Sequence, residues 1–277
     1  MAIRLDRKRI TVSTSTSPLA LVHGETDPWE PRYLTVNGDR AFDMGNHCGT
    51  CSFLFERLEG APNERSPGRL DGALRSGLRR LDDAALNAAS PLIPKGEYDV
   101  ILLAAVPRLV SPFSDADYFF REQADLWGAQ AWDYWTGLPH FTHTAYYRLP
   151  DIAMGKGEML FQFIVPLIPP ALADEKTVKA YMERLEAAES PTALAVSVLD
   201  VKQPAVWGGD QEPEITKHWC LAHFLVDGHH KVCAAARAHR PITLLSYLDR
   251  NEGASSPDEI DAALAVLSAA PGDTASA

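Results

Sequence analysis

One short turn gathers side chains that can hold an anion. The segment LVDGHHKVCAAA joins an apolar strand to an Ala-rich helix through a polar turn. The residues of the turn are Asp227, Gly228, His229, His230 and Lys231. A glycine allows a sharp turn, and the start of a helix offers unpaired N–H donors and the positive end of a dipole. The pattern predicts a phosphate site. The alternative is an ordinary Asp-Gly turn whose histidines are exposed or cap the helix.

The surrounding sequence resembles part of a known superfamily. VDGHHKVCAAARAHRPITLLSYL (226–248) is similar to the second signature of the ParB/sulfiredoxin superfamily, and TALAVSVLDVKQPA (192–205) is similar to the element that precedes it. Known branches are CTP-binding partition proteins, ATP-dependent sulfinate-reducing enzymes and a free-serine kinase. The resemblance implies a nucleotide site for ATP or ADP with Mg²⁺. The phosphate contacts that it implies are Gly228, His229, His230 and Lys231, with Asp227 holding the turn or helping to bind a metal.

Two departures narrow what the resemblance implies. Lys231 stands where arginine is usual, and a lysine cannot form the bidentate fork of a guanidinium. The turn has no counterpart of the sulfinate-reducing cysteine, and the basic helices of the partition proteins are not found, so both activities are disfavoured. We expect nucleotide-dependent phosphotransfer to a small molecule or nucleotide hydrolysis. A non-catalytic nucleotide sensor is the competing hypothesis.

The candidate catalytic residues are Asp227, His230 and Asp200. Asp200 lies in the element before the turn and is a possible general base. The alternative interpretation is a solvated carboxylate at the end of a strand.

A cysteine pair suggests a metal site elsewhere in the chain. Cys48 and Cys51 form a Cys-x-x-Cys motif after a predicted hairpin, which can place two thiolates on one tetrahedral zinc ion. The remaining ligands would come from Cys220, Cys233, His47, His140 or His143. The alternatives are a redox pair or two buried thiols, and a zinc-stabilised structural protein is a third functional class.

Histidines are concentrated around the turn. Five of the nine histidines lie between residues 218 and 239. They could build a hydrolytic metal centre, which is the second hypothesis for the chemistry after phosphate binding. His223 lies in the middle of a predicted strand, however, where a buried and hydrogen-bonded histidine is the usual finding.

Composition limits the partners and the compartment. The chain has 277 residues and a net charge of −11, which argues against broad binding to nucleic acid or to an anionic membrane. Neither a secretory signal nor a membrane-spanning run is apparent, so we expect a cytoplasmic protein whose partners are a nucleotide and a small-molecule substrate.

The predicted elements must position these residues. Strands are predicted at 97–110, 158–168, 191–201, 219–226 and 241–248, and helices at 70–90, 114–135, 174–190, 232–239 and 256–270. Asn37-Gly38 predicts a hairpin within 31–44, and Ser256 with Glu259 predicts a capping box. This mixture predicts an α+β or α/β fold with a mixed sheet. The expected regions are a loose arm (1–18), an α/β region with the cysteine knuckle (19–170), a ParB/sulfiredoxin-like nucleotide-binding region (171–270) and a tail (271–277). One continuous fold is the alternative.

Overall fold

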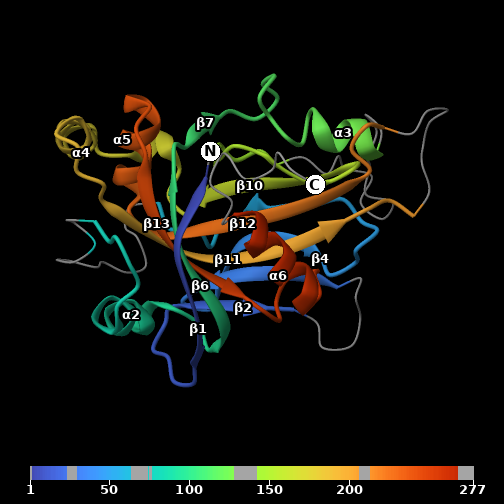
Figure 1. The fold of residues 1–277 in the computed structure, drawn as a ribbon, viewed down its shortest axis with the longest axis horizontal. Coiled ribbons are helices and arrows are strands. Elements are labelled where there is room, and N and C mark those ends of the chain that lie inside the picture. The colour runs from blue at the N-terminus through green and yellow to red at the C-terminus, as the bar shows by residue number, and fades with distance from the viewer. Residues whose placement is uncertain are drawn as a thin grey trace, which may run out of the picture.

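A wide mixed sheet forms the centre of the molecule. The computed structural model describes residues 2–23, 30–63, 74, 77–127, 142–205 and 213–267. Within these ranges nine strands form the sheet in the order β1-β6-β13-β11-β12-β10-β8-β7, with β9 paired to β10 (Figure 1). The mixed sheet and the separate helices confirm the expected α+β class.

The strands at the centre of this sheet position the predicted site. The nine strands are β1 (Ile3–Val12), β6 (Gly96–Ala105), β7 (Arg108–Val110), β8 (Tyr146–Arg148), β9 (Ile152–Gly155), β10 (Glu158–Pro166), β11 (Thr192–Lys202), β12 (Lys217–Asp227) and β13 (Ile242–Asp249). Strands β10 and β12 run parallel, whereas β11 is antiparallel to β12. β11 is buried along its whole length and β12 everywhere but its ends, which explains their nearly continuous apolar sequences.

A smaller antiparallel sheet covers one face of the large sheet. It contains β2 (Leu19–Val22), β3 (Pro31–Val36), β4 (Asp39–Asn46) and β5 (Glu56–Arg57). The predicted Asn37-Gly38 hairpin is confirmed: both residues have positive φ, 53° and 92°, between β3 and β4. A single hydrophobic cluster joins Leu34 and Phe42 of this sheet to Phe224 of β12.

Three helices pack on the opposite face. They are α4 (Glu175–Glu186), α5 (His229–Ala238) and α6 (Pro257–Val266), and a second hydrophobic cluster joins them to the sheet. The short helices α2 (Asp83–Ala89) and α3 (Glu122–Trp127) and the 3₁₀ turns η1 (Ser90–Leu92) and η2 (Pro170–Leu172) complete the described elements. α6 begins with the predicted capping box between Ser256 and Glu259. No described helix is both long enough and apolar enough to cross a membrane.

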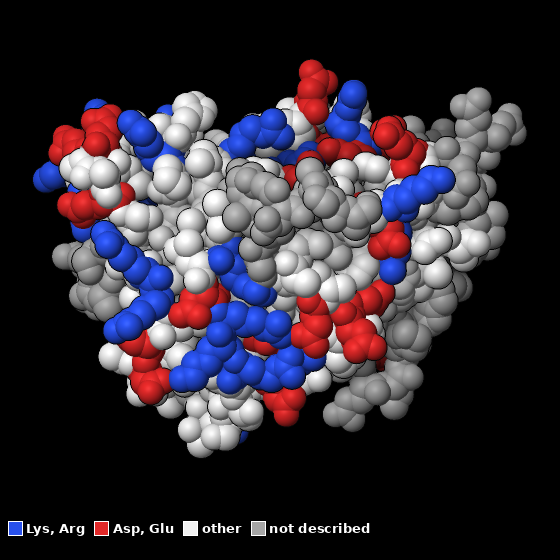
Figure 2. All heavy atoms as spheres, in the orientation of Figure 1, with Lys and Arg blue, Asp and Glu red and all other residues white. Residues whose placement is uncertain are grey.

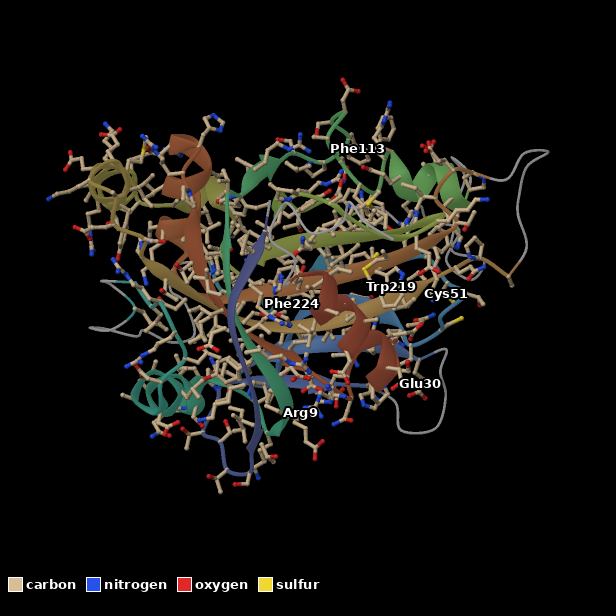
Figure 3. The ribbon with its side chains drawn as sticks, in the orientation of Figure 1. Arg9, Glu30, Cys51, Phe113, Trp219 and Phe224 are labelled. Carbon is tan, nitrogen blue, oxygen red and sulfur yellow. The ribbon has the colours of Figure 1, made fainter. Side chains whose placement is uncertain are left out.

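The first residues of the chain form a strand, where a loose arm was expected. β1 pairs with β6 from Ile3 to Val12. Arg7 contacts both Asp99, which is fully buried, and Asp261, and Arg9 makes weaker contacts with the same carboxylates. Figure 2 shows basic side chains beside acidic ones on one face of the molecule, and Figure 3 labels Arg9 in the same orientation. β1 is stabilised partly by these charged partners. Its sequence lacks the regular apolar alternation that would predict a strand.

The large sheet is continuous across the expected boundary at residue 170. β6 and β10 precede that boundary, and β11, β12 and β13, which follow it, lie between them in one sheet. The described arrangement therefore corresponds to the alternative of one continuous fold.

Two predicted helices are shorter than expected in the described residues. The helix predicted at 70–90 includes α2, and residues 70–73 and 75–76 lie outside the described ranges. The helix predicted at 114–135 begins only with α3, because Asp117 accepts hydrogen bonds from the Phe113 and Phe119 amides and holds this segment in turns. Residues 128–135 and the tail at 271–277 also lie outside the described ranges.

Candidate functional site

The predicted turn lies at an edge of the sheet where two parallel strands end. β12 ends at Asp227 and its parallel neighbour β10 ends at Pro166, so both carboxyl ends meet at this edge. In open sheets that contain helices, ligands bind beyond such carboxyl ends. The predicted order of strand, turn and helix is observed, but α5 begins at His229, three residues before the predicted start at 232, so His229, His230 and Lys231 lie in the first turn of the helix.

Gly228 is required by the shape of this turn. Its φ is +97°, and a Cβ added there would lie 2.8 Å from the Cβ of Ala193 on β11. Any side chain would therefore push β11 away from α5. Gly228 is also the N-cap of α5 and has no side chain to accept a hydrogen bond from the first helical turn. The positive end of the α5 dipole consequently has no side-chain cap.

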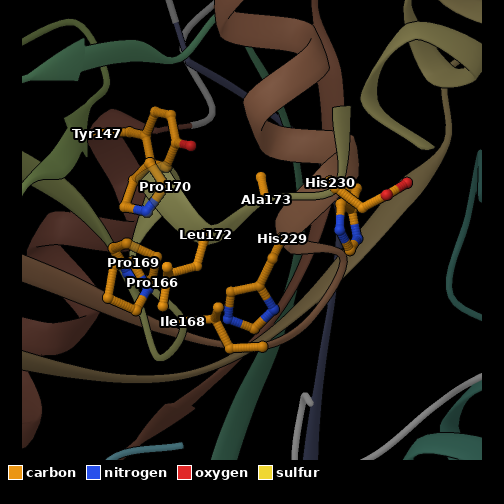
Figure 4. A pocket seen from close by; sticks show the side chains of 10 residues that line it. Tyr147, Pro166, Ile168, Pro169, Pro170, Leu172, Ala173, His229 and His230 are labelled. Atoms are coloured by element: carbon orange, nitrogen blue, oxygen red, sulfur yellow. The ribbon is translucent and has the colours of Figure 1, made fainter. Parts of the chain in front are cut away.

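A cavity of about 140 Å³ lies between this turn and the segment that follows β10. It is lined by Tyr147, Pro166, Ile168, Pro169, Pro170, Leu172, Ala173, Asp174, His229 and His230. Figure 4 shows the prolines and Tyr147 facing the two histidines. The wall is mainly apolar, and its polar groups are the two imidazoles, the Tyr147 hydroxyl and one carboxylate.

His229 is a buried polar group of the cavity that lacks a partner. Its exposed fraction is 8%, and its Nε2 has no hydrogen-bond partner. Burial, together with the charge of His230, lowers the pKa of His229 to about 3, so the imidazole is neutral at pH 7. A neutral imidazole can donate one N–H to an anion, and a bound anion would supply the missing partner of Nε2.

Asp174 brings a negative charge to the same cavity. It is the N-cap of α4 and accepts a hydrogen bond from the Thr177 amide at 2.7 Å. That hydrogen bond, with the nearby charge of His230, holds the pKa of Asp174 below its usual range. The cavity therefore combines anion donors with one carboxylate, a pair that suits a phosphate accompanied by a divalent cation.

Lys231 and Asp227 fix the turn and do not line the cavity. The Nζ of Lys231 donates to the Thr192 carbonyl at 2.8 Å and lies 3.5 Å from the Asp227 carboxylate. Both side chains are largely buried. The structure therefore brings His229 and His230 to the cavity, while Gly228 shapes the turn outside the cavity lining and Lys231 contacts β11.

Replacing Lys231 with methionine should lower the free energy of unfolding by about 3 kcal/mol, because the change leaves the Asp227 charge without its buried partner. Chemical denaturation of the variant measures this loss. Lys179→Met, which changes an exposed lysine on α4, is the matched control and should have almost no effect. Equal stability of the two variants would show that the Lys231 contacts contribute nothing.

Asp200 lies far from the turn. Its register partner on β12 is Cys220, seven residues before Asp227, which corresponds to roughly 20 Å along the strand. Its carboxylate is fully buried and accepts two hydrogen bonds from Arg32. Burial raises the pKa of Asp200, but the charges of Arg32 and Lys202 outweigh burial and hold it well below its usual range. A carboxylate held in this way stabilises the fold and is a poor general base.

Within the described ranges, no third metal ligand lies close to Cys48 and Cys51. Cys48 and Cys51 are free and half-buried, and the Cys48 Sγ lies 3.0 Å from the Thr50 hydroxyl. Burial raises the pKa of Cys51 to about 12, while hydrogen bonds from Cys51 and Thr50 outweigh burial at Cys48 and lower the pKa of that thiol. Across the described ranges, the single group of three or more metal-ligand side chains is His23, His47 and Glu252.

The other expected zinc ligands lie elsewhere. Cys220 is buried beside the Tyr118 hydroxyl, Cys233 is buried on α5, and His143 lies against Glu56. His140 is outside the described ranges.

Two of the clustered histidines belong to buried hydrogen-bond networks. The Nδ1 of His218 lies 2.7 Å from the Tyr118 hydroxyl, and the Nδ1 of His223 lies 2.7 Å from the Ser197 hydroxyl. Burial lowers the pKa of both imidazoles to about 3. They are neutral residues of the interior, and the described residues between 218 and 239 form no group of three metal ligands.

Sequence reasoning missed Asp174 and the proline-rich wall of the cavity. The run IPPALAD follows β10 directly. The parallel pairing of β10 with β12 places this run beside the Asp-Gly turn, and no local sequence pattern specifies that pairing.

The chain was compared with known proteins at three levels. It matches no protein-family model, no curated protein and no solved structure. Its function must therefore be inferred from the geometry of the site.

Proposed function

We propose that this chain binds a nucleotide, ATP or ADP, through a phosphate group held at the start of α5. The observation that carries the proposal is His229, a buried neutral imidazole in the cavity wall whose Nε2 has no partner. The uncapped start of α5 adds backbone donors and a positive dipole end at the same point. The likeness of the turn to the ParB/sulfiredoxin superfamily agrees with this proposal.

The size of the cavity limits which part of the nucleotide enters it. A volume of about 140 Å³ is below the range of roughly 300 to 1,000 Å³ that is typical of sites for whole small molecules. We therefore assign the cavity to a phosphate group, with the base and ribose outside it. Mg²⁺ would be held between the phosphate and the Asp174 carboxylate.

The reaction that such a site would support is phosphoryl transfer to a small molecule or nucleotide hydrolysis, carried out in the cytoplasm. Both reactions depend mainly on positioning and on neutralisation of charge, which donors at a helix start and a Mg²⁺ ion provide. His230 lines the cavity and is the candidate that could contact a reacting group. Asp227 acts by holding Lys231, and Asp200 takes no part.

A non-catalytic nucleotide sensor is the second candidate. The observation that favours it is the single carboxylate of the cavity wall, Asp174, which already caps α4. A site with so few metal ligands can bind a phosphate without activating an attacking group.

The experiment that tests the proposal is a ligand panel. Purified protein is mixed with ATP, ADP, CTP, pyrophosphate or inorganic phosphate, with and without Mg²⁺, and both the melting temperature and product formation are followed. We expect stabilisation by the nucleotides, and turnover separates the enzyme from the sensor. No stabilisation and no product with any of the ligands would overturn the proposal.

Replacing Asp174 with asparagine should strengthen phosphate binding in the absence of Mg²⁺ by roughly fivefold, because it removes a negative charge near the anion. Asparagine is as good an N-cap as aspartate, so α4 should keep its stability. In the presence of Mg²⁺ the gain should disappear. Calorimetric titration with and without Mg²⁺ measures both effects, and Glu183→Gln on α4 is the control. Unchanged affinity in both conditions would place Asp174 outside the site.

A further inference from the structure

Three metal-ligand side chains from distant parts of the chain meet where strands of the two sheets end. His23 follows β2, His47 follows β4 and Glu252 follows β13. One ligand atom from each lies within 4.8 Å of the other two. The His23 Nε2 is 3.1 Å from the Glu252 carboxylate, and the two imidazole rings meet edge to face at 4.7 Å.

The contacts around His47 do not satisfy the hydrogen-bonding capacity of its imidazole. Its Nε2 is buried and has no hydrogen-bond partner. Burial and the charge of Arg32 lower the pKa of His47 to about 4, so its imidazole is neutral at pH 7, the form that binds metals. A metal ion at this point would give Nε2 its missing partner.

Positive side chains near the cluster are paired with a carboxylate. Arg32 is paired with Asp200 through two hydrogen bonds, and Lys202 lies 3.4 Å from the same carboxylate. Glu252 is half-buried, and burial raises its pKa. A bound cation would reverse that shift by stabilising the carboxylate.

We infer that His23, His47 and Glu252 bind one first-row transition-metal ion, with Zn²⁺ the best fit. Two imidazoles and one carboxylate suit zinc, whereas Mg²⁺ and Ca²⁺ prefer oxygen ligands alone. Zinc lies about 2 Å from such ligands, so ligand atoms now within 4.8 Å need to approach by only about 1 Å.

Three protein ligands leave a coordination position open. Zinc ions with three protein ligands keep a water or substrate molecule in the fourth position. Glu252 also lines a groove of about 290 Å³ together with Leu21, Lys95 and Asp249. One of the three ligands therefore faces a space that a small ligand can enter. This site is independent of the α5 cavity and is distinct from the cysteine pair.

The test combines affinity with the identity of the ligand atoms. Zn²⁺ affinity is measured by competition with a chromogenic chelator for the wild type, Glu252→Gln and His47→Gln. We expect each substitution to weaken binding by roughly 100-fold or more, because each removes one of three ligands. Circular dichroism of the metal-free variants verifies that both are folded.

The Cys48→Ser/Cys51→Ser double variant is the matched control and should bind Zn²⁺ as the wild type does. X-ray absorption of the zinc-loaded wild type should show nitrogen and oxygen ligands at about 2.0 Å and no sulfur at about 2.3 Å. Sulfur in the first shell, loss of binding in the double variant, or no binding by the wild type would each overturn the inference.

Discussion

Replacing His229 with phenylalanine should abolish binding of nucleotide phosphates while leaving the fold at least as stable as the wild type. The imidazole is buried and its Nε2 is unpaired, so the unliganded protein gains little from the polar atom. Phenylalanine has a similar shape, fills the same space and removes the donor. The affinity should fall by 100-fold or more, equivalent to about 3 kcal/mol, because a hydrogen bond to a charged group is lost and the anion is left against an apolar wall.

Calorimetric titration with ADP and Mg²⁺ measures the affinity, and urea unfolding measures the stability. His143→Phe, which alters an exposed histidine away from the cavity, is the control and should bind as the wild type does. A His229→Phe protein that retains its affinity would remove the imidazole from the site. A His229→Phe protein that unfolds would show that the fold depends on a contact of the imidazole.

Lowering the pH from 7.5 to 5 should reduce the free energy of unfolding by about 6 kcal/mol. His218, His223 and His229 are buried, and the pKa of each is lowered to about 3. In the unfolded chain each histidine titrates near pH 6.5, so below that pH the unfolded state takes up protons that the folded state cannot. At pH 5 the effect is about 2 kcal/mol for each histidine.

The predicted change in the free energy of unfolding has a definite direction and a definite pH range. Stability should be constant above pH 7 and should fall as the pH drops from about 6.5 towards 3. Because a typical domain has only about 5 to 15 kcal/mol of stability, much of the fold should be lost near pH 5. Urea denaturation at several pH values measures the effect, and His218→Gln should reduce the slope by about one proton. Equal stability at pH 5 and pH 7.5 would contradict the burial of neutral histidines.

The sequence predicted local features well, because neighbouring residues determine them. The Asp-Gly turn before α5, the Asn37-Gly38 hairpin and the Ser256 capping box all depend on residues within a few positions. The strands with apolar runs were equally visible. The charged strand β1 was not, since its stability depends on Asp99 and Asp261, far along the chain.

The candidate sites could be predicted only in part. The turn residues His229 and His230 do reach one cavity, but its opposite wall comes from the segment after β10 and includes Asp174. That wall depends on the parallel pairing of β10 with β12, which no local pattern specifies. The meeting of His23 and His47 with Glu252 depends on three separate strand ends in the same way.

The central claim is that a phosphate group binds at the first turn of α5. The most direct test is a ¹⁵N NMR titration of the labelled protein with ADP and Mg²⁺, following the backbone amides and the His229 imidazole. We predict saturable shifts that are largest at the His229 and His230 amides and at the His229 ring nitrogens, and that are absent in His229→Phe. Saturable shifts confined to other residues, or no shifts at millimolar ADP, would contradict the claim.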